Sequence, residues 1–329
     1  MTLWAKLLTS VAQQLPTALL VVVESTAHSP GRQGFTMALS SDQVLAGTIG
    51  GGPMEYRLIA YARRLLEEKN QRVELLPQVH RRSDKHSSGM ICRGEQLIAL
   101  CPLYSKDLEA LRILADNSPH GLRGSWELSA SGLSVNLQQS AAQHRQFHRE
   151  TKENWSYREN LSPEFYLFII GAGHVGLAIS RIAATLNFYT TVIDHRPHLS
   201  QLHDNCFAQQ VIVAPYEALK RLVPEGHNVF AVVVTTNAKT DELALQQLIN
   251  KNLGYLGVMG SSSKIEHLLS VLRKAGTDER NIARLKAPLG AAISSHTAEE
   301  IGVSIAAELI SIRNSPQLSR GYEQEASRN

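Results

Sequence analysis

Two glycine-rich segments carry residue types that suit the binding of an anion. In the first, residues 171–176 (G-A-G-H-V-G) follow an apolar stretch and precede a helical pattern. There Gly171 allows a tight turn, Gly173 lets a pyrophosphate approach the backbone, and Gly176 lets the helix pack on the strand. Asp194 ends the next predicted strand, where an acid that binds a ribose hydroxyl belongs. The pattern predicts a βαβ unit that binds a dinucleotide, and plain helix–strand packing is the alternative role of these glycines.

The second glycine-rich segment is residues 47–55, G-T-I-G-G-G-P-M-E. Gly50, Gly51 and Gly52 form a loop between a predicted strand and a predicted helix, and its amides can turn toward an anion. Glu55 falls in the first turn of that helix, where a carboxylate is favourable for the helix dipole. The alternative is a tight turn that lets two segments of the chain approach closely, and residue types alone leave both open.

An arginine and a cysteine are further candidates in the first half of the chain. Arg32 lies in the Gly- and Pro-containing residues 29–34, and its planar guanidinium suits a phosphate or a carboxylate. Cys92 follows the basic residues 80–86, and nearby cations lower the pKa of a thiol and make it a better nucleophile or metal ligand. The alternatives are a solvated arginine and a buried structural thiol. Cys101 and Cys206 are expected only as small core residues.

A last candidate segment is residues 257–264, G-V-M-G-S-S-S-K, which closes one predicted strand and starts a helix. Ser261 and Lys264 are therefore expected at the carboxyl edge of a sheet, where open α/β folds bind ligands. The alternative is ordinary helix capping by Ser262 or Ser263. Neither a Ser-His-Asp order with a nucleophile elbow nor an H-E-x-x-H motif occurs, so no catalytic residue is assigned.

The elements that position these residues differ between the two halves. In the second half, short β-branched strands alternate with helical stretches, which predicts a parallel sheet in a doubly wound, Rossmann-like domain. The first half mixes helices with hairpin-like strands. Polar residues 143–160 fit an interdomain linker with short strands, or an edge hairpin. We expect an α/β protein with an N-terminal mixed α/β domain over 1–150, a C-terminal Rossmann-like domain over 162–312 and a flexible tail over 313–329.

Composition limits the possible environments and partners. The 329 residues are 43% hydrophobic and 19% charged, with a net charge of +3. This charge is too small to predict nucleic-acid binding, and no apolar run approaches the ~20 residues of a membrane span. The start lacks the long apolar segment of a secretory signal. Three widely spaced cysteines form neither a disulfide framework nor a zinc signature, so a cytoplasmic location is expected.

Taken together, these segments resemble the XdhC/CoxI family, the accessory factors of xanthine dehydrogenase and related molybdenum hydroxylases. The resemblance covers nearly the whole chain, and the glycine segment 47–55 is its most specific part. Arg93 departs from it, because the family has a glycine directly after the cysteine. The matching segments are residues 28–34, 47–55, 89–94, 171–176, 194–196, 255–264, 288–290 and 297–308.

The resemblance implies a chaperone that binds the molybdenum cofactor (molybdopterin), protects it during sulfuration and passes it to an apo molybdenum hydroxylase of the xanthine dehydrogenase type. It also implies a cysteine desulfurase and cofactor-synthesis enzymes as partners, and a homo-oligomer. Cys92 would be the metal ligand, because soft molybdenum suits a thiolate. The implied cofactor-binding residues are Arg32, Gly50, Gly51, Gly52, Glu55, Cys92, Gly171, Gly173, Gly176, Asp194, Ser261 and Lys264.

Two other functions stay open. An NAD(P)-dependent oxidoreductase would use the Rossmann-like domain, but no acid or base stands out beside an expected nicotinamide. A pure interaction scaffold would leave that domain empty.

Overall fold

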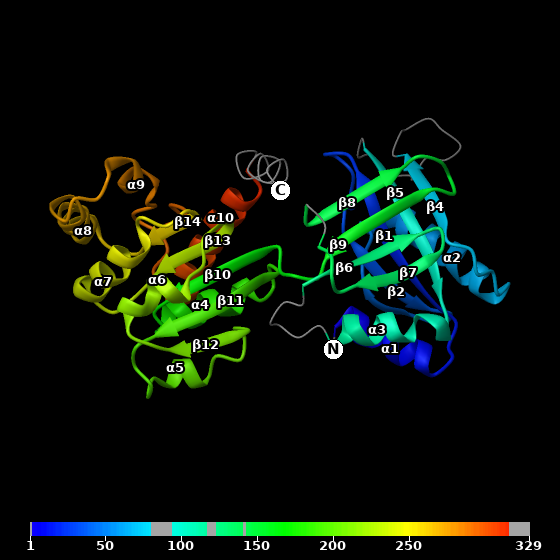
Figure 1. Cartoon of the computed structure of the whole chain (residues 1–329), viewed down its shortest axis with the longest axis horizontal. Helices are drawn as coiled ribbons and strands as arrows, with labels where there is room; N and C mark the ends of the chain where they lie inside the picture. The colour runs from blue at the N-terminus through cyan, green and yellow to red at the C-terminus, as the bar shows by residue number, and fades with distance from the viewer. Residues whose placement is uncertain (1, 80–93, 117–122, 141–142, 316–329) are drawn as a thin grey trace. The chain divides into compact units, whose positions relative to one another are not determined.

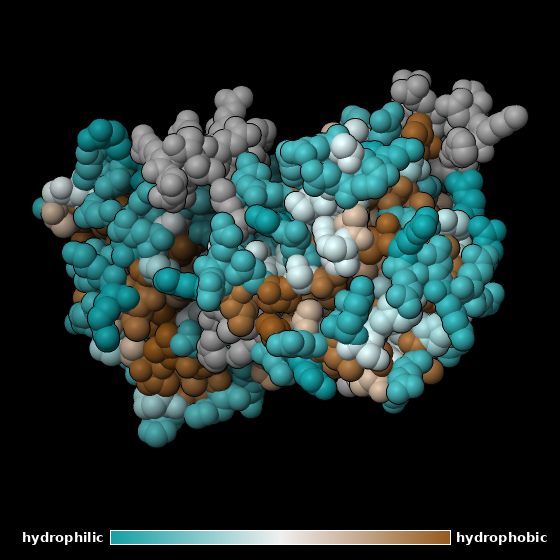
Figure 2. All heavy atoms as spheres, turned by 45° about the vertical axis from the view of Figure 1, so that its right-hand side comes forward, coloured by the Kyte–Doolittle hydropathy of each residue, from teal (hydrophilic) through white to brown (hydrophobic). Residues whose placement is uncertain are grey.

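The computed structural model describes residues 2–79, 94–116, 123–140 and 143–315. The chain folds into two compact units, Met1–Ser162 and Pro163–Asn329 (Figure 1). No helix formed by the described residues is long and apolar enough to cross a membrane. Most of the surface seen in Figure 2 is hydrophilic, with smaller hydrophobic areas between the polar side chains.

The larger sheet of the first unit is antiparallel, with the strand order β3-β2-β1-β5-β4. Its central strand is apolar from Ala18 to Val23 because both of its faces are covered. Leu20 packs with Leu58 on one face, and Leu19 packs with Leu111 on the other. The elements are α1 (Leu3–Ala12), β1 (Thr17–Ser25), β2 (Thr36–Ser40), β3 (Val44–Gly47), α2 (Gly52–Glu67), β4 (Glu74–Val79), β5 (Glu95–Leu103), η1 (Ser105–Asp107) and α3 (Leu108–Ala115).

The smaller sheet of the first unit has the order β7-β6-β9-β8. Its strands are β6 (Ser125–Ser129), β7 (Gly132–Asn136), β8 (Arg145–Arg149) and β9 (Trp155–Asn160). Residues 143–160 therefore form an edge hairpin, the second of the two alternatives, and not an interdomain linker. Trp155 and Tyr157 are only 4% and 0% exposed, which holds this hairpin in the core of the first unit. The first unit consequently extends to Ser162, past the expected end at residue 150.

The second unit is built on a parallel sheet with the order β12-β11-β10-β13-β14. Strand β10 pairs with β11 on one side and β13 on the other, so the strand order reverses at β10. The loops after β10 and β13 therefore leave the carboxyl edge side by side, the usual place for a ligand in such folds. The strands are β10 (Phe165–Ile170), β11 (Phe188–Asp194), β12 (Gln210–Val213), β13 (Gly226–Val233) and β14 (Leu253–Val258).

Helices cover both faces of this sheet (Figure 1). Leu245 and Leu268 belong to the buried cluster on one face, and Ile179 and Ile305 belong to the cluster on the other. The expected fold class is confirmed: an N-terminal mixed α/β domain and a C-terminal Rossmann-like parallel sheet. The helical elements are α4 (His174–Ala183), α5 (Ser200–His203), η2 (Tyr216–Ala218), α6 (Leu219–Leu222), α7 (Ala238–Leu248), α8 (Ser262–Lys274), α9 (Glu279–Arg284) and α10 (Ala298–Arg313).

The expected flexible tail begins at residue 313, but α10 continues through Arg313. Residues 316–329 of that tail lie outside the described residues.

Candidate functional site

The loops that contain Arg32 and the glycine run are locked together in the first unit. A Cβ added to Gly31 would lie 2.3 Å from the carbonyl oxygen of Ile49, and one added to Gly50 would lie 2.6 Å from the Gly31 nitrogen. The buried side chain of Gln96 joins the same loops, because its Oε1 accepts from the Gly31 amide at 2.9 Å and its Nε2 donates to the Ile49 carbonyl at 3.2 Å. Close approach of two segments, the alternative left open above, is therefore one task of these glycines.

Gly94, the residue directly before β5, also contacts the loop that contains Arg32. A Cβ on Gly94 would lie 2.5 Å from the Ser29 nitrogen, so these two segments can pack closely only with glycine there. Sequence reasoning missed Gln96, whose only signal is a single amide at the start of an apolar strand.

Glu55 closes the glycine loop from within. Its Oε2 accepts from the Ile49 and Gly51 amides, both at 2.9 Å, and from the Thr48 hydroxyl at 2.5 Å. The expectation that the amides of this loop face an external anion is wrong for these two, since a carboxylate in the first turn of α2 reaches back to them. Glu55 thus holds the loop in place, and its Oε2 already accepts from donors of the chain itself.

Space remains open at Gly51 and beside the start of α2. Gly51 has a φ of +73°, and a Cβ added there would meet no heavy atom of the described residues within 4 Å. It is the N-cap residue of α2 and provides no side-chain cap. Pro53 has no N–H, so the amides of Gly52 and Met54 are the first-turn donors that remain available. Arg32 is exposed, and its Nη1 donates to the Thr26 carbonyl at 3.2 Å. The N-terminus of α2 can therefore accept an anion.

The three cysteines differ in what the structure says of them. Cys92, the expected metal ligand, lies outside the described residues. Cys101 is buried, and this burial raises the pKa of its thiol to about 12, as expected of a structural core residue. Cys206 is exposed, so its assignment to the core was wrong. No group of three or more His, Cys, Asp or Glu that could hold a metal ion occurs in the described part of the chain.

The three glycines after β10 have three separate environments. Gly171 has a φ of +112°, and its added Cβ would lie 2.6 Å from the Val234 carbonyl oxygen. A Cβ on Gly176 would lie 2.1 Å from the Gly171 carbonyl oxygen, so α4 can pack closely only with glycine there. Gly173 has an ordinary φ of −67°, and no atom in the part of the chain that the structure describes lies within 4 Å of an added Cβ. Packing thus explains two of these glycines, while the third borders open space at the N-terminus of α4.

Asp194 does not serve as an open ribose-binding acid. Asp194 is 0% exposed. Its Oδ2 accepts from the Ala172 amide and from Arg196 Nη2, both at 2.8 Å. Its Oδ1 accepts from the Arg196 amide at 3.0 Å and from Arg196 Nε at 2.9 Å. Four donors fill its acceptor positions. Burial alone would raise the pKa of Asp194, but these hydrogen bonds outweigh burial and lower it. Asp194 therefore fastens the glycine loop to the end of β11.

Lys264 and Ser261 also have internal partners. Lys264 forms an ion pair with the wholly buried Asp241 and donates to the Met259 carbonyl at 3.1 Å. Thr235 donates to the other carboxylate oxygen of Asp241 at 2.6 Å. The Ser261 side chain caps α8 by accepting from the Lys264 amide, so capping falls to Ser261 rather than to the expected Ser262 or Ser263. Sequence reasoning missed Asp241, which looks like an ordinary first-turn carboxylate.

Tyr216 completes a buried polar layer beneath the carboxyl edge. It is 3% exposed, and its ring centroid lies 5.0 Å from that of His195. Burial, and then the negative charge of Asp194, raise the pKa of its hydroxyl, which therefore stays protonated. The structure thus brings the sites after β10, β11, β13 and β14 to one edge, where Arg196 and Lys264 are each held by a buried carboxylate.

Comparisons with known proteins match each of the two units to a domain of one family. The model of the XdhC and CoxI family matches residues 10–76, and the model of the XdhC Rossmann domain matches residues 167–309. The chain is 28% identical over 312 residues to the uncharacterized protein YqeB of Escherichia coli, a match that covers 92% of this chain and 44% of that protein. It is 30% identical over 156 residues to a protein of Bacillus subtilis described as a probable xanthine dehydrogenase subunit, a match that covers 47% of this chain and 45% of that protein.

The chain therefore spans less than half the length of the curated relatives it matches. A crystal structure of a xanthine dehydrogenase from Bacillus halodurans shares the fold, with a TM-score of 0.71 at 24% identity over 96% of this chain and 98% of that chain. Two domain models of one family match successive parts of the chain, which thus belongs to the XdhC and CoxI family and carries an XdhC Rossmann domain in its second unit.

Proposed function

We propose that this chain is an accessory protein that binds the molybdenum cofactor and passes it to an apo molybdenum hydroxylase of the xanthine dehydrogenase type. Family membership supports this proposal, as does the description of the Bacillus subtilis relative as part of a xanthine dehydrogenase. The observation that supports it most strongly is the pair of loops that Gln96 holds together. Gly51 belongs to one of these loops, and no described residue crowds it at the start of α2.

The residues around Gly51 suit the chemistry of this group. When bound, the cofactor supplies the molybdenum centre that the hydroxylase needs, and this chain's residues would hold and orient it. The first-turn amides of α2 would donate to its phosphate, and the Arg32 guanidinium would add a cation with a planar set of donors. Glu55 would hold the loop in shape through the Ile49 amide without touching the ligand.

A second anionic group would bind at the start of α4. Gly173 leaves space for it, and the uncapped N-terminus of α4 supplies donors. This group could belong to a dinucleotide form of the cofactor or to NAD(P), the ligand of the alternative oxidoreductase. The filled acceptor positions of Asp194 weigh against the usual recognition of a nicotinamide-dinucleotide ribose.

The finer parts of the proposal rest on the resemblance alone. They are a molybdenum–thiolate contact at Cys92, protection of the cofactor during sulfuration by a cysteine desulfurase, and assembly into a homo-oligomer. Delivery to a hydroxylase is the part that a single assay can test.

The test compares two alanine variants with the same backbone cost. Gly51 and Gly276 have φ values of +73° and +80°, and at either position an added Cβ meets none of the described residues within 4 Å. Gly51→Ala adds a methyl group at the proposed site, whereas Gly276→Ala adds one after α8. Each protein is mixed with molybdenum cofactor and an apo hydroxylase, and the recovered hydroxylase activity is measured.

We expect Gly51→Ala to lower activation by about tenfold, because a methyl group in a filled site costs about 1–3 kcal/mol. Gly276→Ala should activate like the unmodified protein. Equal activation by both variants would remove the glycine loop from the proposal, and no activation by the unmodified chain would reject the delivery function.

A further inference from the structure

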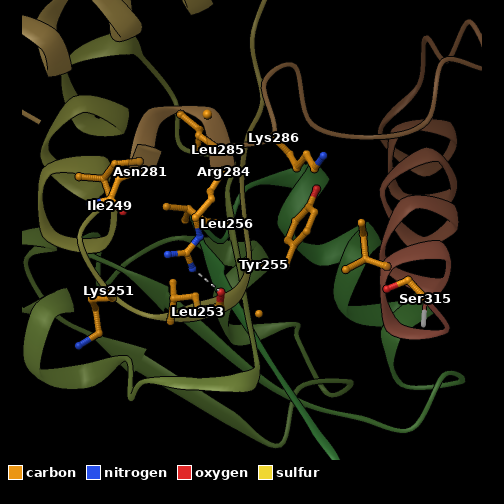
Figure 3. Close-up of a pocket in the computed structure, with 13 residues that line it drawn as sticks. Ile249, Lys251, Leu253, Tyr255, Leu256, Asn281, Arg284, Leu285, Lys286 and Ser315 are labelled. Carbon is orange, nitrogen blue, oxygen red and sulfur yellow. Dashed lines mark hydrogen bonds between the residues drawn. The ribbon is translucent and has the colours of Figure 1, made fainter. Parts of the chain in front are cut away.

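A pocket of about 380 Å³ lies beside the edge strand β14 of the second unit, near the end where that strand begins (Figure 3). Its walls come from β14, from α9 with the residues that follow it, and from the end of α10. None of the glycine, serine or aspartate residues discussed above lines it. The volume falls in the range of about 300–1,000 Å³ that is usual for small-molecule sites.

The floor of this pocket is apolar. Leu253, Leu256 and Leu285 line it, and each is less than 10% exposed. Tyr255 adds a ring that is 4% exposed, and its hydroxyl is occupied by donating to Glu308 Oε2 at 2.8 Å. The floor can therefore hold a flat apolar group against side chains that carry no unpaired polar atom.

The charged side chains that line this pocket are all positive. Its lining contains Lys251, Arg284 and Lys286 but no Asp or Glu. Lys251 lies 3.7 Å from a carboxylate oxygen of Glu225, whereas Arg284 and Lys286 have no carboxylate partner among the described residues.

The Arg284 side chain is nevertheless fixed in place. Its Nη2 donates to the Leu253 carbonyl at 2.9 Å, the bond drawn in Figure 3, and this leaves other guanidinium N–H groups unused. The cations at the carboxyl edge differ, because Arg196 and Lys264 each pair with a buried aspartate. Two uncompensated positive charges above an apolar floor attract an anion that carries an apolar body.

We propose that this pocket is a second ligand site, which binds a small anion, a phosphate or a carboxylate, attached to an apolar ring. Arg284 and Lys286 bind the charged group, and the floor of leucine and tyrosine side chains receives the ring. The site is separate from the proposed cofactor site and does not depend on the proposed function.

Calorimetric titration of the full chain with 1-naphthyl phosphate tests this site, with cyclohexanecarboxylate as the carboxylate probe and 1-naphthol as the uncharged one. Lys286→Gln removes a charge whose side chain has no hydrogen-bond partner among the described residues. The double variant Arg284→Gln with Lys286→Gln removes both charges. The matched control, Arg221→Gln with Lys274→Gln, removes two charges that do not line the pocket.

We expect Lys286→Gln to weaken naphthyl phosphate binding by about tenfold and the double variant by about a hundredfold, since each substitution removes one charged hydrogen bond to the anion. Naphthol should bind weakly and equally to all variants, and the control should match the unmodified chain. Should the double variant misfold, Lys286→Gln alone still decides. The proposal is overturned if neither anion binds at millimolar concentration, or if Lys286→Gln and the control bind alike.

Discussion

The two glycine loops, one in each unit, are held by the same kind of hydrogen bond but differ at their open glycine. Each connects a strand to a helix, and in each a carboxylate accepts from loop amides: Glu55 from the first turn of its own helix, and Asp194 from the neighbouring strand. Each also leaves one glycine, Gly51 or Gly173, at which an added Cβ has no heavy atom within 4 Å among the residues that the structure describes. In both loops, therefore, a carboxylate of the chain holds the backbone through loop amides, and one glycine stays uncrowded by the described residues.

The two loops differ in the backbone conformation of the uncrowded glycine. Gly51 has a φ of +73°, which by itself favours glycine whether or not a ligand binds. Gly173 has a φ of −67°, which any residue adopts, and nothing in the described chain crowds it. The backbone therefore accounts for Gly51, whereas neither backbone conformation nor crowding by the described residues accounts for Gly173.

The largest effect on stability is expected at the carboxylate of the second loop. Asp194→Asn removes a buried charge that accepts four hydrogen bonds, and it should lower the free energy of unfolding by about 3 kcal/mol. Because the folded pKa of Asp194 is lowered, its contribution is present above the ordinary pKa of about 3.9 and is lost as pH falls through the folded value.

Urea unfolding of both proteins between pH 7 and pH 3 measures this. The stability difference should be constant near neutrality and shrink below about pH 4. A difference under about 0.5 kcal/mol at pH 7 would mean that Asp194 does not hold the loop.

The carboxylate of the first loop should matter less, because Glu55 is only partly buried. We expect Glu55→Gln to lower the free energy of unfolding by about 1–2 kcal/mol, since one acceptor oxygen loses its charge toward two amides. Glu299→Gln is the matched control, because Glu299 is an exposed first-turn glutamate of α10. Equal losses in the two variants would assign the effect of Glu55 to the helix dipole alone.

The open glycine of the first loop should show only its backbone cost. Gly51→Ala and Gly276→Ala should each lower the free energy of unfolding by about 1 kcal/mol, the cost of a left-handed residue with a Cβ. Thermal unfolding of the ligand-free proteins measures this. A much larger loss of stability in Gly51→Ala would show that the chain crowds Gly51. The variant could then not distinguish an effect on ligand binding from an effect on folding.

The smallest effect on stability is expected at the open glycine of the second loop. Gly173→Ala should leave the free energy of unfolding within about 0.5 kcal/mol, since the backbone is ordinary and the space is empty. If an anion binds at the start of α4, the same variant should nevertheless lose most of its affinity for it. Unchanged affinity for the natural ligand would leave Gly173 without a role in binding.

Periodicity and local motifs were enough to predict the fold. Alternating strands and helices predicted the parallel sheet, and the glycine motif over residues 171–176 predicted the start of α4 at the end of its first strand. The hairpin over residues 143–160 was harder to recognise because its apolar positions are sparse. Trp155 and Tyr157 become core residues only through the partner strand β6, which local sequence does not reveal.

The candidate site was predicted in its positions but not in its hydrogen bonds. Motif spacing placed Glu55, Asp194 and Lys264 at loops that lie at helix starts or sheet edges. It could not show that Gly51, Ala172 and Asp241 would be their partners, because those contacts depend on how the loops fold back. Residue type predicts that a carboxylate will bind a donor, while tertiary structure decides whether the donor belongs to a ligand or to the chain.

The identity of the ligand that the protein carries is the most direct test of the proposed function. The protein is purified from cells that make the molybdenum cofactor, and the small molecules released on denaturation are identified by mass spectrometry. We expect a form of molybdopterin from the unmodified chain and from Gly276→Ala, and about tenfold less from Gly51→Ala. Release of a nicotinamide dinucleotide, or of no ligand from any of the three proteins, would contradict the proposal that this chain binds the molybdenum cofactor.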